Sequence, residues 1–140
     1  MTNKLLLADL DIMARTIYGE GRGESQRQRI AIGHVLLNRW HSTTGQWAKD
    51  NTLATTCLRP WQFSAWNDGD PNMDKMMNVT LNNRAFRYCM QAALAALNNP
   101  DITEGARHYH TVAMGWPHAW GVRKEPCVVI GEHAFYNNVR

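Results

Sequence analysis

The sequence predicts a single α+β domain, with helices in the first two thirds of the chain and a small antiparallel sheet in the C-terminal third. Apolar residues recur at helical spacing as far as residue 98. Short β-branched and aromatic runs, separated by turn residues, begin at residue 108. A chain of 140 residues can bury one substantial core but not two ordinary ones, so we expect residues 1–140 to form one domain. Helices first and strands last are typical of the α+β class.

The first predicted helix covers residues 8–20 and ends in a glycine-rich segment. Glu20 shares the apolar face of this helix with Ile17, three residues earlier. Gly21 and Gly23 stop the helix, which leaves Glu20 at its carboxyl end. Burial and the negative end of the helix dipole both raise the pKa of a carboxyl group in this position, as a general acid requires. The alternative is an ordinary solvated glutamate at a fraying helix end.

Residues 26–40 form the second predicted helix, because Ser25 and Gln28 have the spacing of a capping box. Apolar residues occur almost all round this helix, which predicts that it is the buried central helix of the domain. A short helix is expected around residues 47–57, after a polar stretch.

Residues 59–75 are expected to form an extended loop, since Asp-Gly at 68–69 and Asp-Pro at 70–71 are typical of turns. An amphipathic helix is expected at residues 82–98, where two asparagines and a proline end the apolar pattern. The sequence shows no internal repeat and no linker between domains.

The last third of the chain predicts strands at residues 108–112, 127–130 and 133–136, with a Gly-Glu turn between the last two. Side chains alternate between the two faces of a strand. His108 and His110 should therefore lie on one face of the first strand, and Tyr109 on the other.

Composition and charge exclude several classes of protein. The net charge of +3 and the pI near 8.9 suit an anionic partner such as a cell wall, whereas no basic cluster or nucleic-acid motif supports binding to nucleic acid. Cys57, Cys89 and Cys127 are far apart and odd in number, so we expect buried free thiols rather than disulfides or a cysteine zinc site. No apolar run is long enough to span a membrane. We expect a monomer without stable membrane insertion.

Six tryptophans stand out in a chain of this length. Most of them, including Trp66 and Trp120, lie in polar or proline-containing segments rather than in apolar periodic ones. Flat aromatic side chains in such segments suggest a groove that binds its ligand by stacking, although packing of the core and its rim is the alternative for any one of them.

Six motifs occur in order along nearly the whole chain. They are Tyr18-Gly19-Glu20-Gly21-Arg22-Gly23-Glu24, Gln28 with Ala31-Ile32-Gly33-His34-Val35-Leu36-Leu37-Asn38-Arg39, Gln62-Phe63-Ser64, Gly105-Ala106-Arg107-His108-Tyr109-His110, Pro117 with Ala119-Trp120, and Ile130-Gly131-Glu132-His133-Ala134-Phe135-Tyr136. In this order they resemble the SleB-type cell-wall hydrolases, which include spore-cortex-lytic enzymes and phage endolysins. That family usually has alanine where this chain has Gly21.

The resemblance implies a helix-rich, lysozyme-like fold and cleavage of the glycan strand of peptidoglycan between N-acetylmuramic acid and N-acetylglucosamine. In the family this reaction is commonly lytic transglycosylation, which needs no cofactor, and the catalytic glutamate corresponds to Glu20. A transglycosylase needs one carboxyl group, because the substrate supplies the nucleophile. A hydrolase (a muramidase) needs a second carboxylate. Glu24 is the nearest candidate by sequence, although we expect it to lie past the turn.

Further residues are expected to bind the glycan. The hydroxyl of Tyr109 could stabilise charge or position a sugar near the acid, and Gln62 could bond an acetamido group. Aromatic and imidazole side chains could line the groove or belong to the core. The full set of substrate-binding candidates is Glu24, Gln62, Trp66, Tyr109, His110, Trp120 and Tyr136.

Two other functions remain open from the sequence. His108 and His110, with His118 or His133, could bind zinc as in a metal-dependent N-acetylmuramoyl-L-alanine amidase of the cell wall. The tryptophans and the positive charge would also suit a non-catalytic wall-binding module. The start of the chain has no secretory signal pattern, so we expect an endolysin made in a host cytoplasm that acts on the cell wall after release.

Overall fold

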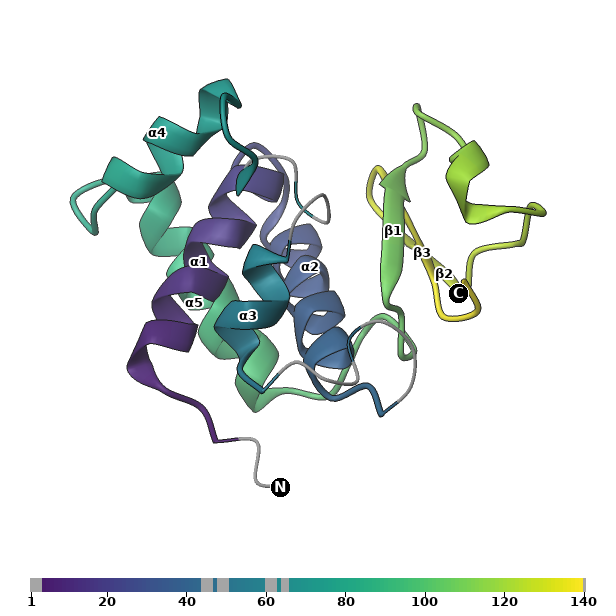
Figure 1. Cartoon of the computed structure of the whole chain (residues 1–140), viewed down its shortest axis with the longest axis horizontal. Coiled ribbons are helices and arrows are strands. Elements are labelled where there is room, and N and C mark those ends of the chain that lie inside the picture. The colour runs from purple at the N-terminus through teal and green to yellow at the C-terminus, as the bar shows by residue number, and fades with distance from the viewer. Residues whose placement is uncertain (1–3, 44–46, 48–50, 60–62, 64–65, 140) are drawn as a thin grey trace.

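The computed structural model of the chain describes residues 4–43, 47, 51–59, 63 and 66–139. Helices come first in these residues and a three-stranded antiparallel sheet comes last, so the predicted α+β class is confirmed (Figure 1). The elements are α1 (Leu7–Gly21), α2 (Gln26–Trp40), α3 (Leu53–Leu58), α4 (Pro71–Asn78), α5 (Arg84–Asn98), β1 (His108–Thr111), a 3-10 helix η3 (His118–Trp120), β2 (Val128–Ile130) and β3 (His133–Tyr136). None of the described helices is both long and apolar enough to cross a membrane.

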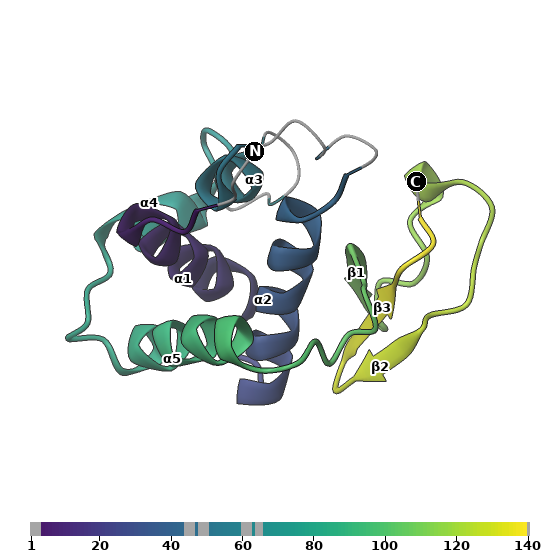
Figure 2. The ribbon, with the colours of Figure 1, turned by 90° about the horizontal axis from the view of Figure 1, so that it is seen from below.

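Helix α2 lies between the other helices and the sheet (Figures 1 and 2). Ser25 caps its first turn by accepting a hydrogen bond from the backbone of Gln28, as the capping box predicts. Ile32 and Leu36 pack into the core shared with α1 and α5, whereas Ala31 and Val35 pack into a second core with the sheet. The prediction of a buried central helix is confirmed, because α2 is covered on both sides.

The first and fifth helices agree with their sequence patterns. Helix α1 ends at Gly21, one residue past Glu20. Helix α5 begins after Asn83, which caps it through the backbone of Phe86. At Gly33 a side chain would meet the Cβ atom of Ala96 at 2.9 Å, so the absence of a side chain lets α2 and α5 approach closely.

The sheet has the strand order β1-β3-β2, and its register separates two faces. Tyr109 pairs with Phe135 across β1 and β3, and these residues belong with His133 to the inner face, which packs on α2. His108 pairs with Tyr136, and these residues belong with His110 to the outer face. The predicted separation of Tyr109 from the two histidines is therefore confirmed.

The middle of the chain agrees with one prediction and contradicts another. The short helix expected around 47–57 corresponds to α3, where the hydroxyl of Thr52 accepts a hydrogen bond from the backbone N–H of Thr55. The loop expected at 59–75 contains the start of α4, because Asp70 accepts a hydrogen bond from the backbone of Asn72 and proline occupies the first helical position. The same Asp-Pro pair is typical of turns and of helix starts, which explains the error.

The three cysteines are free. Cys57 and Cys89 are buried as expected, whereas Cys127 is partly exposed and donates to the carbonyl oxygens of Thr103 and Phe135.

Candidate active site

Glu20 and Tyr109 meet between the end of α1 and the inner face of the sheet. The hydroxyl of Tyr109 donates a hydrogen bond of 2.6 Å to Oε1 of Glu20, which is 89 residues away in the sequence. Glu20 as a whole residue is partly exposed, whereas its carboxyl group is largely buried. The fold therefore brings the predicted acid next to Tyr109, the strand residue expected to face away from His108 and His110.

The surroundings of Glu20 favour its protonated form. Burial raises the pKa of this carboxyl group above its ordinary value, and the nearby carboxylate of Asp70 adds to the effect. The hydrogen bond from Tyr109 and the positive charge of Arg39 oppose the rise without cancelling it. Burial also raises the pKa of Tyr109 well above its usual 10, so the phenol stays neutral and remains a donor.

Helix α1 is braced one turn before Glu20. Nε1 of Trp66 donates to Oγ1 of Thr16 at 2.9 Å, and that hydroxyl donates to the carbonyl of Ile12 at 2.7 Å. Trp66 is partly buried and packs against the core. The structure therefore places Trp66 close to the acid, as a support for the helix that carries Glu20.

Glu24 lies beyond the end of α1, as expected, and it does not continue the helical face of Glu20. Its Oε2 accepts a hydrogen bond of 3.2 Å from Nε2 of Gln28. The same amide nitrogen lies 3.0 Å from Nδ1 of His133, and the side chain of Gln28 covers Gly131, whose φ is +57°. This buried glutamine ties the α1–α2 turn to the inner face of the sheet.

The structure groups three other candidates on the outer face of the sheet. Nε2 of His110 lies 2.8 Å from the hydroxyl of Tyr136, and the two rings stack. Trp120 packs against both of them. Tyr109 points to the other face of the sheet, where its hydroxyl contacts Glu20. Gln62 lies outside the described residues.

Within the described residues, the histidines are not grouped as a metal site would require. No group of three or more histidine, cysteine or acidic side chains could hold a metal ion in the part of the chain that the structure describes. His108 lies between the rings of Trp47 and Trp120, where burial lowers its pKa to about 4. His110 and His133 are bonded to different partners on opposite faces of the sheet. The geometry of the described residues therefore does not support the zinc amidase alternative.

Comparison with known proteins identifies the family. The model of the Cell Wall Hydrolase family matches residues 23–136. The chain belongs to this family. It is 34% identical over 132 residues to the spore cortex-lytic enzyme of Halalkalibacterium halodurans and 32% identical over 130 residues to that of Bacillus subtilis. These matches cover 92% and 91% of this chain but only 34% and 37% of the relatives, so the chain spans about a third of their length.

Two solved structures have the same fold. The catalytic domain of the Bacillus cereus SleB protein superposes with a TM-score of 0.74 at 27% identity, covering 97% of this chain and 94% of that one. The catalytic domain of the germination-specific lytic transglycosylase SleB from Bacillus anthracis gives a TM-score of 0.72 at 27% identity, covering 97% and 99%. The chain therefore shares the SleB catalytic fold along nearly its whole length.

The fold accommodates glycine at position 21. A Cβ atom on Gly21 would lie 2.9 Å from Cδ1 of Ile32, so the end of the Ile32 side chain fills the space that an alanine methyl group would take. At Gly21 the end of the Ile32 side chain therefore makes the apolar contact that an alanine methyl group would otherwise make.

Sequence reasoning missed two charged neighbours of the acid. Asp70 was assigned to a turn, and it acts on Glu20 from the start of α4. Arg39 was named only as the last residue of a family motif, although it is 5% exposed and acts on both Glu20 and Tyr109. A charged residue in a helix that is apolar all round was the available signal for Arg39.

Proposed function

We propose that this chain is one catalytic domain of a lytic transglycosylase, and that it cleaves peptidoglycan between N-acetylmuramic acid and N-acetylglucosamine with Glu20 as general acid and base. The observation that carries the proposal is the Glu20–Tyr109 pair, in which burial favours a protonated carboxyl group held in one orientation. The Bacillus anthracis relative is a germination-specific lytic transglycosylase, which supports the same reaction.

In the first step Glu20 donates a proton to the glycosidic oxygen. Tyr109 donates to Oε1, which leaves Oε2 to carry the acidic proton. The bond between C1 of the muramoyl residue and the bridging oxygen breaks, and the glucosamine unit leaves with the proton as a hydroxyl group. Positive charge develops at C1 as the bond breaks. The new Glu20 carboxylate keeps its hydrogen bond from Tyr109.

In the second step the Glu20 carboxylate removes the proton from the 6-hydroxyl group of the same muramoyl residue. The 6-oxygen then bonds to C1, which gives a 1,6-anhydro product and restores the acid. No water is consumed and no second carboxylate is needed.

Hydrolysis is the second candidate reaction, because Asp70 is a second carboxylate whose charge acts on Glu20. A muramidase would need a second carboxylate roughly 5 to 9.5 Å from the acid. The carboxylate of Asp70 caps α4, and that of Glu24 is bonded to Gln28. Since each has a structural partner, we favour transglycosylation.

The wider biological role is inferred from the family and from charge. Peptidoglycan is the proposed partner, and the net charge of +3 suits this anionic polymer. The matched relatives are spore cortex-lytic enzymes, so a role as a phage endolysin stays a prediction.

The test is digestion of purified peptidoglycan, with mass spectrometry of the soluble products. Wild type should release anhydro-muropeptides, and Glu20→Gln should reduce their rate of release by about 100-fold or more, because an amide cannot donate this proton. Glu104→Gln, the same change at an exposed glutamate, is the matched control and should retain most of the activity. Reducing-end muramic acid would instead show hydrolysis, and full activity of Glu20→Gln would overturn the proposal.

A further inference from the structure

Arg39 is a buried cation, and among the described residues no acidic side chain forms an ion pair with it. Its side chain lies in the last turn of α2 and is 5% exposed. Within the described residues, Nη1 has no hydrogen-bond partner, and no ion pair within 4 Å involves this guanidinium. A buried charge costs free energy unless it is paired, so its retention here needs an explanation.

The contacts of Arg39 compensate only part of that cost. Nε donates to the carbonyl of Arg107 at 2.7 Å, just before β1. The guanidinium lies over the rings of Trp47 and Phe63, at 4.7 and 5.1 Å from their centroids. Cation–π contacts of this kind hold the group in place without neutralising it. Burial lowers the pKa of Arg39 to about 10, so it still carries its charge at neutral pH.

Titratable groups face Arg39 from three other elements, and most of them are neutral. The pKa of Tyr109 is raised well above 10, that of Cys57 on α3 is raised to about 12, and that of His108 is lowered to about 4. Arg107 adds a second positive charge near β1. Of the described groups that act electrostatically on Arg39, Glu20 at the end of α1 is the carboxylic acid. Asp70 acts on Glu20 from α4.

We propose that Arg39 is the counter-charge of Glu20: it stabilises the carboxylate that forms when Glu20 has donated its proton, and so it acts on the reaction through the acid. This inference rests on the proposed role of Glu20. Before the reaction Glu20 is protonated, and Arg39 has no anion to pair with among the described residues. As the proton leaves, a negative charge develops where a fixed positive charge is already in place, so little reorganisation is needed.

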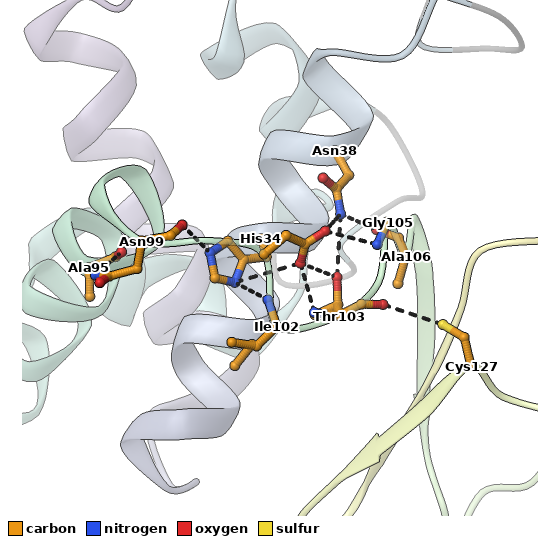
Figure 3. A network of polar contacts seen from close by, with 10 residues as sticks. His34, Asn38, Ala95, Asn99, Ile102, Thr103, Gly105, Ala106 and Cys127 are labelled. Atoms are coloured by element: carbon orange, nitrogen blue, oxygen red, sulfur yellow. Dashed lines mark hydrogen bonds and ion pairs between the residues drawn. The ribbon is translucent and has the colours of Figure 1, made fainter.

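Asn38, the neighbour of Arg39, provides a control for a merely structural role. Its Nδ2 donates to the carbonyl of Ala106 and to Oδ2 of Asp101, each at 2.9 Å. Figure 3 shows Asn38 reaching from α2 to the segment that contains Thr103, Gly105 and Ala106. Asn38 and Arg39 thus anchor the same connection before β1, through the carbonyls of residues 106 and 107, but only Arg39 is charged.

The experiment compares Arg39→Gln, Arg39→Lys and Asn38→Ala with wild type. Glutamine keeps a donor for the Arg107 carbonyl but removes the charge, whereas lysine keeps the charge. The pH dependence of kcat/KM for glycan cleavage is measured for each, and the carboxyl group of Glu20 is titrated by NMR in protein labelled with ¹³C-glutamate.

Removal of the charge should raise the pKa of Glu20. For Arg39→Gln we expect the alkaline limb of the pH profile and the NMR titration to move up by about one pH unit. We also expect kcat to fall about tenfold or more, because the carboxylate is less well stabilised. In Arg39→Lys both transitions should stay near those of wild type. Asn38→Ala should melt at a lower temperature without moving either transition.

Two results would overturn the inference: an Arg39→Gln protein with an unmoved Glu20 titration, or an Asn38→Ala protein that shifts as much as Arg39→Gln. If Arg39→Gln does not fold, Arg39→Met serves as the second uncharged variant, with circular dichroism to establish its fold. The NMR titration does not depend on activity. A catalytically active Glu20→Gln would therefore defeat the proposed function, whereas an unmoved titration defeats only the role of Arg39.

Discussion

The two faces of the sheet carry similar side chains but differ in what those side chains contact. On the inner face, Tyr109 bonds to Glu20 at the end of α1, and His133 bonds to Gln28 at the start of α2. Each bond joins strands to helices that are far away in the sequence. The inner face therefore positions the proposed acid relative to the rest of the fold.

The aromatic side chains on the outer face contact one another. His110 bonds to Tyr136, and the rings of Trp116 and Trp120 pack around them. Beside this cluster lies a pocket of about 220 Å³, lined by Arg123 and Glu125 among others. The same residue types thus contact the helices on one face and other aromatic rings on the other.

Among substitutions in the sheet, the largest effect should come from Tyr109→Phe, which removes one hydroxyl group from the inner face. Loss of the hydrogen bond to Glu20 frees the orientation of the acid and weakens the support of its carboxylate. We expect kcat for release of anhydro-muropeptides to fall by about 10- to 100-fold.

Tyr136→Phe is the matched control, because it removes one hydroxyl group from the outer face. It breaks the bond to His110 and should lower the free energy of unfolding by about 1 kcal/mol while activity stays within about twofold. Equal losses of activity in the two variants would end the functional distinction between the faces.

The next largest effect should be a change in the pH dependence of stability in His108→Phe. The pKa of His108 is lowered from 6.5 to about 4, so the unfolded chain takes up a proton more readily than the folded one. Stability from this group is complete above pH 6.5 and is lost as the pH falls towards 4, by at most about 3 kcal/mol.

Phenylalanine keeps an aromatic ring between Trp47 and Trp120 but cannot be protonated. Urea unfolding at several pH values should therefore show a smaller loss of stability in acid for His108→Phe than for wild type. Parallel curves for the two proteins would mean that the imidazole is not shielded on the outer face.

A smaller effect is expected for Gln28→Ala, which removes the amide between the α1–α2 turn and the inner face. The substitution leaves Nδ1 of His133 and the backbone of Ser25 without their partner. We expect a loss of about 1 to 3 kcal/mol in the free energy of unfolding, measured with urea. The exposed neighbour Arg27, replaced by alanine, should change stability by less than about 0.5 kcal/mol. Similar losses in both variants would argue against the bridge.

The smallest effects are expected for Arg123→Ala and Glu125→Ala. Both residues are exposed and line the pocket of the outer face. Stability should change by less than about 0.5 kcal/mol, and the initial rate of peptidoglycan digestion should stay within about twofold. A marked loss of activity would show instead that the outer face binds substrate, as the sequence suggested for His110, Trp120 and Tyr136.

Local patterns in the sequence predicted several parts of the fold well. Ser25 and Gln28 marked the start of α2, and strand alternation separated Tyr109 from the histidines, because both patterns involve residues close together in the chain. Asp70 and Pro71 were misread, since the same pair suits a turn or a helix start and the choice depends on the conformation of the next several residues. The roles of Trp66 and Trp120 could not be separated, because burial of an aromatic ring depends on distant elements.

The sequence by itself determined that a carboxyl group ends the first helix on its apolar face, since helical phase is a property of a few consecutive residues. Only the tertiary structure decided which groups surround that carboxyl group. Tyr109, Arg39 and Asp70 come from three different elements, and their effect on Glu20 depends on distance and burial in the folded chain. Electrostatic environment is therefore the part of this site that no local pattern could predict.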